Sequence, residues 1–380
     1  MTTSLAAYLD WNATGKLRPQ ARAAMVAAMT IDGNPSSVHA AGRAARHVVE
    51  TAREQVAALV GVAARDVVFT SGGTEANMMA LSPSLGETLL VSAIEHPSVR
   101  SGGRFAAVEE IPVTTAGVID LAALEWRLAG RSRPLVSLML ANNETGVIQP
   151  IAAAAAIVHA AGGLLHVDAV QGPGRIACDF DALGADLMTV SSHKIGGPQG
   201  VGALIKREGM FLAPLIKGGG QERGARAGTE NVAGIAGFAA AAEAVAQLLV
   251  EEVSWIASLR EGLEAGLRAI APNVVIFGAE APRLPNTTLF SIPGMKAETA
   301  VIAFDLEGVA VSSGSACSSG KVASSHVLAA MGIPQELARG GIRVSIGYST
   351  TEDDITAILR AWAKLAEGLY KADKRQEIAA

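Results

Sequence analysis

Short apolar segments alternate with helical segments through the first half of the chain, between residues 20 and 210. This alternation is typical of a mostly parallel sheet with helices on both faces. In such sheets, ligands bind beyond the carboxyl ends of the strands. We expect strands at 66–70, 88–92, 108–113, 135–140, 164–167, 187–190 and 201–205, and helices at 43–60, 74–81, 121–128 and 151–161.

A long helical segment, residues 230–271, separates this region from a smaller set of strands and helices. The length of 380 residues agrees with two domains. We predict a large α/β domain at 15–250 and a small α+β domain made of 1–14 and 251–380. In the small domain the expected strands are 274–278, 287–291, 309–312 and 342–346, and the expected helices are 299–306, 325–331 and 351–369.

Composition narrows the class of protein. Half of the residues are hydrophobic, which is enough for a large core, and the net charge is −5 without a basic stripe. We therefore expect no direct binding of nucleic acid. The sequence has no apolar run long enough for a membrane span and no signal peptide at its start, so no membrane attachment is expected. Two cysteines exclude a disulfide framework and favour a cytoplasmic location.

Lys194 is the most informative residue, because it lies where a strand-like run meets a glycine-rich loop. A solvated surface charge explains this position poorly, whereas an amine that condenses with an aldehyde in a pocket explains it well. Asp168 ends another strand-like run. An acid there would keep a pyridine nitrogen protonated, and the lysine would carry the aldehyde carbon. Together the two residues predict a site for pyridoxal 5′-phosphate (PLP).

The segment Thr70–Asn77, of sequence TSGGTEAN, joins a strand to the start of a helix. Its glycines let the backbone approach a ligand closely, and the amides at the helix start attract a phosphate. Gly73 and the hydroxyl of Thr74 are therefore candidates for phosphate binding. An ordinary strand–helix turn is the alternative for this segment.

Three further polar residues follow strand ends. His96 has two interpretations: a ring stacked on the cofactor that also handles protons, or a histidine that caps a helix before Pro97. Asn143 can donate to the phenolic oxygen of the cofactor, although an Asn-rich turn is the alternative. Gln171 can reach the same oxygen. We interpret His193, beside Lys194, as a phosphate donor.

Cys317 lies among Ser, Gly and Ala, a setting that indicates a reactive thiol rather than a packed one. Cys178 is expected to pack in the core. Arg343 is a charge inside a strand pattern, and it is either solvated or a clamp for a substrate carboxylate. The glycine-rich segment 217–230 either cradles a second anion, reaches a neighbouring subunit or forms a surface loop. No spacing of Cys and His predicts a metal site.

These motifs together resemble the cysteine desulfurases of the NifS/IscS-like group, which are fold-type I PLP enzymes of the class V aminotransferase lineage. The resemblance runs over nearly the whole chain. Its most specific parts are SSHK at 191–194, GGGQERG at 218–224, RAGT at 226–229 and SSGSAC at 312–317.

The resemblance implies a transferase fold with a large PLP domain and a role for each candidate. Lys194 would hold PLP, Asp168 would pair with its nitrogen and His96 would stack on its ring. Asn143 and Gln171 would contact its phenolic oxygen, and Asn143 and Arg343 would bind the substrate. Cys317 would accept sulfur as a persulfide. The phosphate would be bound by Gly73, Thr74, Ser191, His193 and, from the partner subunit of a homodimer, Thr229.

The implied reaction converts L-cysteine to L-alanine and an enzyme persulfide, which a protein acceptor in iron–sulfur cluster assembly or tRNA thiolation would then receive. Two alternatives stay open at this point. One is another class V reaction, such as transamination, which needs no thiol, or selenocysteine cleavage. The other is a scaffold that binds PLP only for structure, which turnover would exclude.

Overall fold

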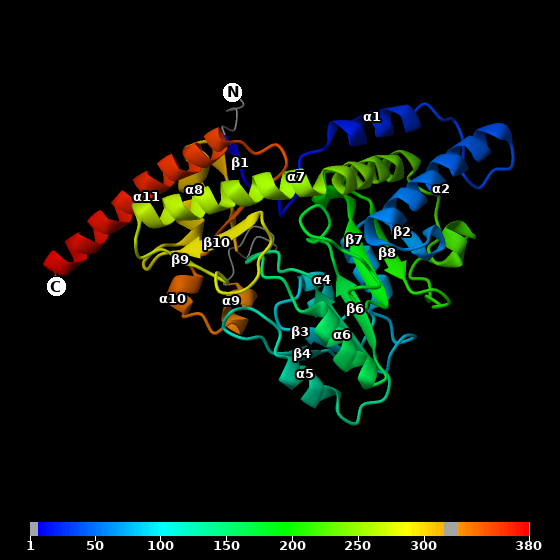
Figure 1. Cartoon of the computed structure of the whole chain (residues 1–380), viewed down its shortest axis with the longest axis horizontal. Coiled ribbons are helices and arrows are strands. Elements are labelled where there is room, and N and C mark those ends of the chain that lie inside the picture. Colours follow the sequence, from blue (N-terminus) through cyan, green and yellow to red (C-terminus); the bar gives the residue numbers. More distant parts are fainter. Residues whose placement is uncertain (1–6, 315–324, 380) are drawn as a thin grey trace.

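The computed structural model describes residues 7–314 and 325–379, with the side chains of the last helix included up to residue 369. Two regions of different architecture lie along the long axis of the molecule, and one helix runs through both (Figure 1). The larger region holds a seven-stranded sheet, and the smaller one holds a four-stranded sheet and a two-stranded pair.

The large sheet has the strand order β2-β8-β7-β6-β5-β3-β4, and only β8 runs opposite to its neighbours on both sides. The strand sequence is rich in branched aliphatic residues, as expected for a buried parallel sheet. The strands are β2 (Val67–Thr70), β3 (Thr88–Ser92), β4 (Glu109–Ile111), β5 (Pro134–Met139), β6 (Leu164–Asp168), β7 (Leu187–Ser191) and β8 (Gly202–Lys206).

Successive side chains of each strand point to opposite faces of this sheet, and each face has its own core. Leu90 packs with the helices of one face, whereas Leu89 and Val91 pack with those of the other. The first face is covered by α2 (Ala40–Val60), α5 (Leu121–Leu128), α6 (Ile151–Ala160) and the first half of α7 (Val232–Ile270), and the second by α3 (Gly73–Ala80) and α4 (Pro97–Arg100).

Helix α7 crosses from the large region to the small one (Figure 1). Its first half packs on α1 (Pro19–Ala28) and α2, and its second half packs on α11 (Glu352–Ala379). Its length and composition would suit a membrane span, but more than half of its most apolar window is buried inside the fold. The predicted domain boundary at residue 250 lies inside this helix, and the division stays a prediction.

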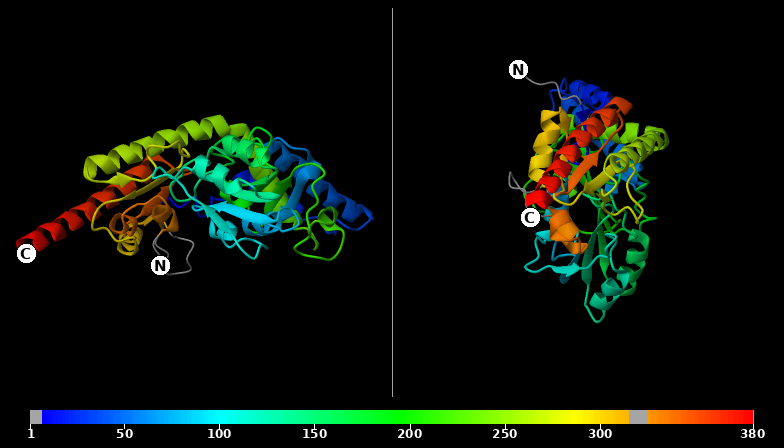
Figure 2. Two further views of the ribbon diagram at one scale, coloured as in Figure 1. Left: turned by 90° about the horizontal axis from the view of Figure 1, so that it is seen from below. Right: turned by 90° about the vertical axis from the view of Figure 1, so that its left-hand side faces the viewer.

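The small region is built on the antiparallel sheet β12-β13-β10-β9, and helices pack on it (Figure 2). The parallel pair β1-β11 brings the start of the chain into its core, where Leu9 is fully buried. Its elements are β1 (Ala7–Tyr8), β9 (Val275–Ile276), β10 (Thr287–Ser291), β11 (Val309–Ala310), β12 (Ser312–Ser313), β13 (Ile342–Ser345), α8 (Ala297–Leu306), α9 (His326–Ala330) and α10 (Gln335–Ala338).

The predicted α/β class is confirmed, and most predicted elements lie within a few residues of their observed bounds. One expected strand, 309–312, is instead two short strands that belong to different sheets, with Val311 between them. Helix α1 was not expected, since its sequence PQARAAMVAA has only a weak apolar face.

Candidate active site

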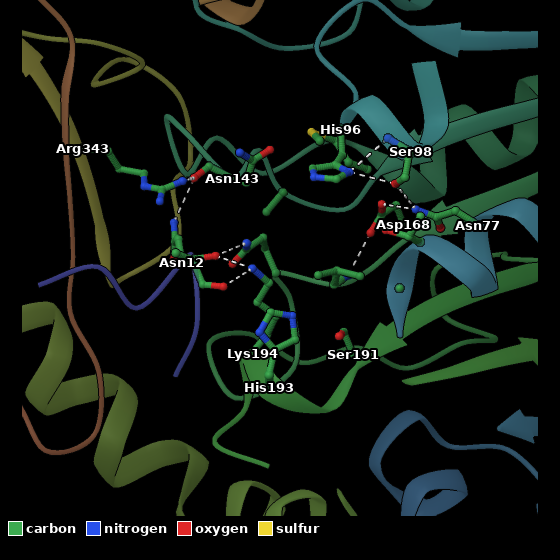
Figure 3. Close-up of a pocket in the computed structure, with 17 residues that line it drawn as sticks. Asn12, Asn77, His96, Ser98, Asn143, Asp168, Ser191, His193, Lys194 and Arg343 are labelled. Carbon is green, nitrogen blue, oxygen red and sulfur yellow. Dashed lines mark hydrogen bonds between the residues drawn. The ribbon is translucent and has the colours of Figure 1, made fainter. Parts of the chain in front are cut away.

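A cavity of about 300 Å³ lies at the carboxyl ends of β3, β5, β6 and β7, where an α/β sheet is expected to bind its ligand. Segments from both regions line it, and their polar side chains point inward (Figure 3). The lining residues are Asn12, Ala13, Gly73, Thr74, Asn77, His96, Ser98, Met139, Ala141, Asn143, Asp168, Val170, Gln171, Ser191, His193, Lys194 and Arg343.

Lys194 projects into this cavity from a short 3₁₀ turn that follows β7. Its Nζ donates hydrogen bonds to the carbonyl oxygens of Asn12, at 2.5 Å, and of Ala13, at 2.8 Å. The N-terminal segment is in turn held by a hydrogen bond from the Gly15 amide to the His193 carbonyl, at 2.7 Å. These backbone oxygens orient the amine, and Lys194 lines the cavity.

Asp168 ends β6 and presents a buried carboxylate to the cavity. Its Oδ1 accepts from the Val170 amide at 3.0 Å, and its Oδ2 accepts from Nδ2 of Asn77 at 2.9 Å. Asn77 also donates to Ser98 Oγ at 2.9 Å. We did not select Asn77 from the sequence, although its position one helical turn after Thr74 places it on the same side of α3.

His96 lines the cavity and also caps helix α4, so its two interpretations are compatible. Its Nδ1 lies 3.2 Å from the Ser98 amide nitrogen, which donates to it, and 2.8 Å from Ser98 Oγ. Burial lowers the pKa of the imidazole, and the positive charge of Lys194 lowers it further against the opposing effect of Asp168. The lowered pKa favours the neutral form of the ring, and the cap orients it.

Gly73, Thr74, Ser191 and His193, which were predicted to bind phosphate, all line the cavity. Gly73 and Thr74 form the first turn of α3, whose amides lack helical partners, and Ser191 ends β7 beside them. Ser191 Oγ is buried without a hydrogen-bond partner among the described residues. His193 adds a ring whose pKa is lowered to about 4 by burial and by the charges of Lys194 and Arg175.

The turn after β5 places Asn143 in the lining of the cavity. The side chain of Asn142 stabilises this turn. Asn142 Oδ1 accepts from the amides of Glu144 and Thr145, each at 2.9 Å. The turn alternative is thus correct for Asn142, whereas Asn143 lines the cavity. Gln171 also lines it, and its Nε2 donates to the Asn12 carbonyl at 3.1 Å.

Arg343 in β13 is only 3% exposed, so the alternative of a solvated strand arginine is wrong. Its Nη2 lies 2.7 Å from Asp10 Oδ1, and its Nη1 donates to the Asn143 carbonyl at 3.0 Å. Its Nε is buried without a partner in the described structure. A guanidinium that lines a cavity is suited to an anionic ligand, which would compete with Asp10 for it.

Asn12 was missed by the sequence analysis, although it connects most of these groups. Besides the carbonyl contacts to Lys194 and Gln171, its Nδ2 donates to Thr287 Oγ1 at 2.9 Å and to the Asn143 carbonyl at 3.1 Å. Nothing in the local pattern marks this asparagine, because its partners lie more than 130 residues away.

Thr229 differs from the other predicted residues that the structure describes. It is exposed and does not line the cavity, so its contribution from a partner subunit stays a prediction. Cys317 lies outside the described residues. Cys178 is 5% exposed, and burial raises the pKa of its thiol to about 12, in agreement with the expected packing role.

The glycine-rich segment 217–230 is attached to the large region by three ion pairs, of which the most exposed joins Arg223 to Glu50 at 3.5 Å. Glu222 forms a buried pair with Arg53, at 2.6 Å, and its Oε2 accepts from the Phe69 amide at 2.8 Å. Arg226 pairs with Glu75 in the first turn of α3 at 2.9 Å. These contacts argue against a flexible surface loop and leave the other two interpretations as predictions.

Glu144 is a buried acid that joins the two regions next to the cavity. Ser325 Oγ donates to its Oε2 at 2.5 Å, and a Cβ on Gly314 would lie 3.0 Å from the same oxygen. Burial raises the pKa of Glu144 from 4.5 to about 7, against the lowering effects of Ser325 and Arg343. The folded protein therefore binds a proton here more tightly than the unfolded chain does.

This raised pKa predicts a pH-dependent stability. The contribution of Glu144 is fully present below pH 4.5 and is lost as the pH rises through 7. We expect Glu144→Gln, which cannot ionise, to gain up to about 3 kcal/mol of unfolding free energy relative to wild type between pH 5 and pH 8. Urea unfolding at both pH values measures this, with exposed Glu298→Gln as control. Equal pH dependence in both variants and wild type would contradict the prediction.

Comparison with known proteins places the chain in a family. The aminotransferase class-V family model matches residues 7–358, so the chain belongs to this family. A protein of Dictyoglomus turgidum named cysteine desulfurase IscS is 39% identical over 374 residues, which cover 95% of each sequence. A cysteine desulfurase of Cereibacter sphaeroides is 40% identical over 377 residues, which cover 95% of this chain and 96% of that protein.

A solved structure agrees with this assignment. The X-ray structure of a NifS-like protein from Rickettsia africae superposes with a TM-score of 0.89 and 40% sequence identity, covering 95% of this chain and 99% of that one. The family resemblance and the fold class predicted from the sequence motifs are thereby confirmed.

Proposed function

We propose that this chain is a PLP-dependent cysteine desulfurase, which removes sulfur from L-cysteine to give L-alanine. The observation that carries the proposal is the joint placement of Lys194, Asp168 and His96 in one cavity whose remaining groups suit a phosphate and a carboxylate. The relatives named cysteine desulfurase support the substrate.

The cavity fits PLP on the chemistry of its donors. Ser191 Oγ is a buried hydroxyl without a partner in the described chain, next to the unbonded amides of α3, and a phosphate would satisfy both. A side chain at Gly73 would come within 2.9 Å of Val170, so only glycine leaves this wall open. Lys194 would hold the aldehyde carbon and Asp168 would pair with the pyridine nitrogen. His96 would lie on the ring, with Asn143 and Gln171 at the phenolic oxygen and His193 and the partner's Thr229 at the phosphate.

When bound, PLP supplies an electron sink for the carbon attached to the amino group. The protein's own groups would do the rest. Arg343 and Asn143 would hold the substrate carboxylate, and Lys194 would remove the proton from Cα. The Cys317 thiolate would attack the substrate sulfur, forming an S–S bond as the Cβ–S bond breaks. The electron pair of that bond stays with carbon, which a proton then converts to the methyl group of alanine, and His96 is placed to carry that proton.

The proposal extends to partners and location. The residues predicted to complete the phosphate site include one from a second subunit, which favours a homodimer. The persulfide on Cys317 would pass to a protein acceptor, either in iron–sulfur cluster assembly or in tRNA thiolation. A reducing cytoplasm is the compartment that suits a reactive thiol. The two-domain division at residue 250 would place the PLP groups on the large domain and Cys317 and Arg343 on the small one.

Incubation of the purified protein with L-cysteine and a reductant tests the function. We expect equal amounts of alanine and sulfide, measured separately. In a second incubation, alanine replaces cysteine as the substrate and an oxoacid other than pyruvate is the amino acceptor. No pyruvate should form there. A protein that binds PLP but releases no alanine from cysteine would contradict the proposal. Transfer of an amino group without sulfide would point to the transaminase alternative.

A further inference from the structure

Glu95 is a buried acid beside the cavity to which the reaction assigns no role. It lies in the turn between β3 and α4, immediately before His96, and is fully buried. Its Oε1 accepts a hydrogen bond from the Met139 amide at 2.7 Å, and its Oε2 is buried without a partner in the described structure.

The contact with Met139 continues the sheet beyond the end of a strand. The pairing of β3 with β5 stops at Val91 and Ser137, and the amide of Met139 is then left facing a strand that has ended. The amide of Leu140, the residue directly after β5, donates in the other direction to the Asp168 carbonyl at 2.8 Å. Alternate amides of an inner parallel strand point to opposite neighbours, so the carboxyl of Glu95 replaces a missing carbonyl of β3.

This replacement connects the two groups that face the cofactor site. Met139 is the register partner of Asp168 in the pairing of β5 with β6. Glu95 is also the chain neighbour of His96, and its carbonyl accepts from Nε2 of His326 in α9 at 3.0 Å. A single side chain therefore fixes the ends of β3 and β5 at the point where His96 and Asp168 enter the cavity.

The surroundings of Glu95 oppose a negative charge. One amide is the only donor that contacts its carboxyl in the described structure, whereas a buried carboxylate needs a cation or several donors. Asp168 of β6 is the titratable group whose charge acts on the Glu95 carboxyl, and the nearby rings of His96 and His326 have pKa values that burial lowers. Burial and the charge of Asp168 raise the pKa of Glu95 well above its usual range.

We propose that Glu95 is a positioning residue that acts as an uncharged acid, holding the ends of β3 and β5 so that His96 and Asp168 keep their places in the cavity. Because Glu95 is neutral in this role, the carboxylate of Asp168 is the negative group nearest the pyridine nitrogen. The inference rests on the proposed function in so far as His96 and Asp168 face PLP.

Glu95→Gln and Glu95→Met distinguish the need for a hydrogen-bond acceptor at position 95 from the need for a negative charge there. Glutamine keeps a neutral acceptor for the Met139 amide, whereas methionine has a similar length and no comparable acceptor. We expect the pH titration of the PLP absorbance to be the same in wild-type and Glu95→Gln holoenzymes. In Glu95→Met its midpoint should move, and the dissociation constant of PLP should rise about tenfold, since a buried amide loses its partner.

Infrared difference spectra of the same proteins test the protonation state directly. Wild type minus Glu95→Gln should show the carbonyl stretch of a protonated carboxylic acid at pH 8. Absence of that band, or an altered titration in Glu95→Gln, would show that Glu95 carries a charge and would overturn the proposal. Unchanged titration and PLP affinity in Glu95→Met would overturn the positioning role. If Glu95→Met does not fold while Glu95→Gln folds and titrates normally, the need for a neutral acceptor is supported.

These readings do not depend on cysteine. The infrared band requires no cofactor, and the absorbance requires only bound PLP. A protein that passes these tests but forms no alanine would refute the proposed function and leave the role of Glu95 intact. A protein that forms alanine and sulfide from cysteine but whose Glu95 is ionised would support the proposed function and refute the role of Glu95.

Discussion

Lys194→Ala is expected to lower desulfuration by at least about 10³-fold, because the lost amine has two roles that no neighbour can supply. It is the residue expected to hold the cofactor carbon and to remove the proton from Cα. In the described structure its Nζ is oriented by the carbonyl oxygens of Asn12 and Ala13, and no other lysine lines the cavity among the described residues.

The measurement is twofold. Borohydride reduction followed by mass analysis should attach PLP to Lys194 in wild type and attach none in the variant, while alanine formation is followed in parallel. Lys296→Ala is a matched control, because this lysine is exposed at the start of α8 and outside the cavity. Attachment of PLP to another lysine in Lys194→Ala, or activity near that of wild type, would refute the assignment.

The parts of the site predicted from the sequence are those that come directly after strands. Asp168, Lys194, His96 and Asn143 each follow an apolar run, and the carboxyl ends of parallel strands meet at one edge of the sheet. Local pattern therefore fixes both their secondary structure and their meeting point. The same reasoning located most elements of the fold, because their apolar periods and turn residues are local properties.

The parts that could not be predicted depend on contacts between distant segments. Asn12 lies in the cavity because β1 pairs with β11, some 300 positions later in the chain. No local sequence pattern predicts that pairing. The sequence pattern places Asn77 at the end of a phosphate-binding segment, whereas its hydrogen bond to Asp168 follows from the packing of α3 on the sheet. For Arg343, the sequence left burial and exposure equal, and the register of β13 between β10 and β12 decides it.

Glu95 and Glu144 illustrate a further limit. Both are ordinary glutamates in the sequence, and their raised pKa values arise from complete burial, which depends on tertiary packing. Charge counting treats both as negative at neutral pH. Burial in the fold raises the pKa of Glu95 well above its usual range and that of Glu144 to about 7, which counting charged residues in the sequence does not capture.

Cys317→Ala is expected to retain bound PLP and its absorbance but to lose sulfide release from cysteine by about 10³-fold or more, since it removes the proposed nucleophile. The chain has two cysteines, and the structure argues against the other one. Cys178 is packed in the core of the large region, donates to the Ile176 carbonyl, and has a thiol pKa of about 12. A thiol with that pKa is almost never a thiolate at neutral pH.

Cys178→Ala is therefore the matched control, since it removes a thiol of the same kind from a site that cannot react. Its sulfide release should stay near that of wild type, with at most a modest loss of stability from the small cavity created. Labelling of the persulfide by an alkylating reagent after a single turnover should locate the transferred sulfur on Cys317 in both wild type and Cys178→Ala. Sulfide release that survives in Cys317→Ala but disappears in Cys178→Ala would reverse the assignment. Loss in neither variant would mean that sulfur leaves the substrate without a protein thiol, by elimination at Cβ, and that the chain binds cysteine for a different reaction.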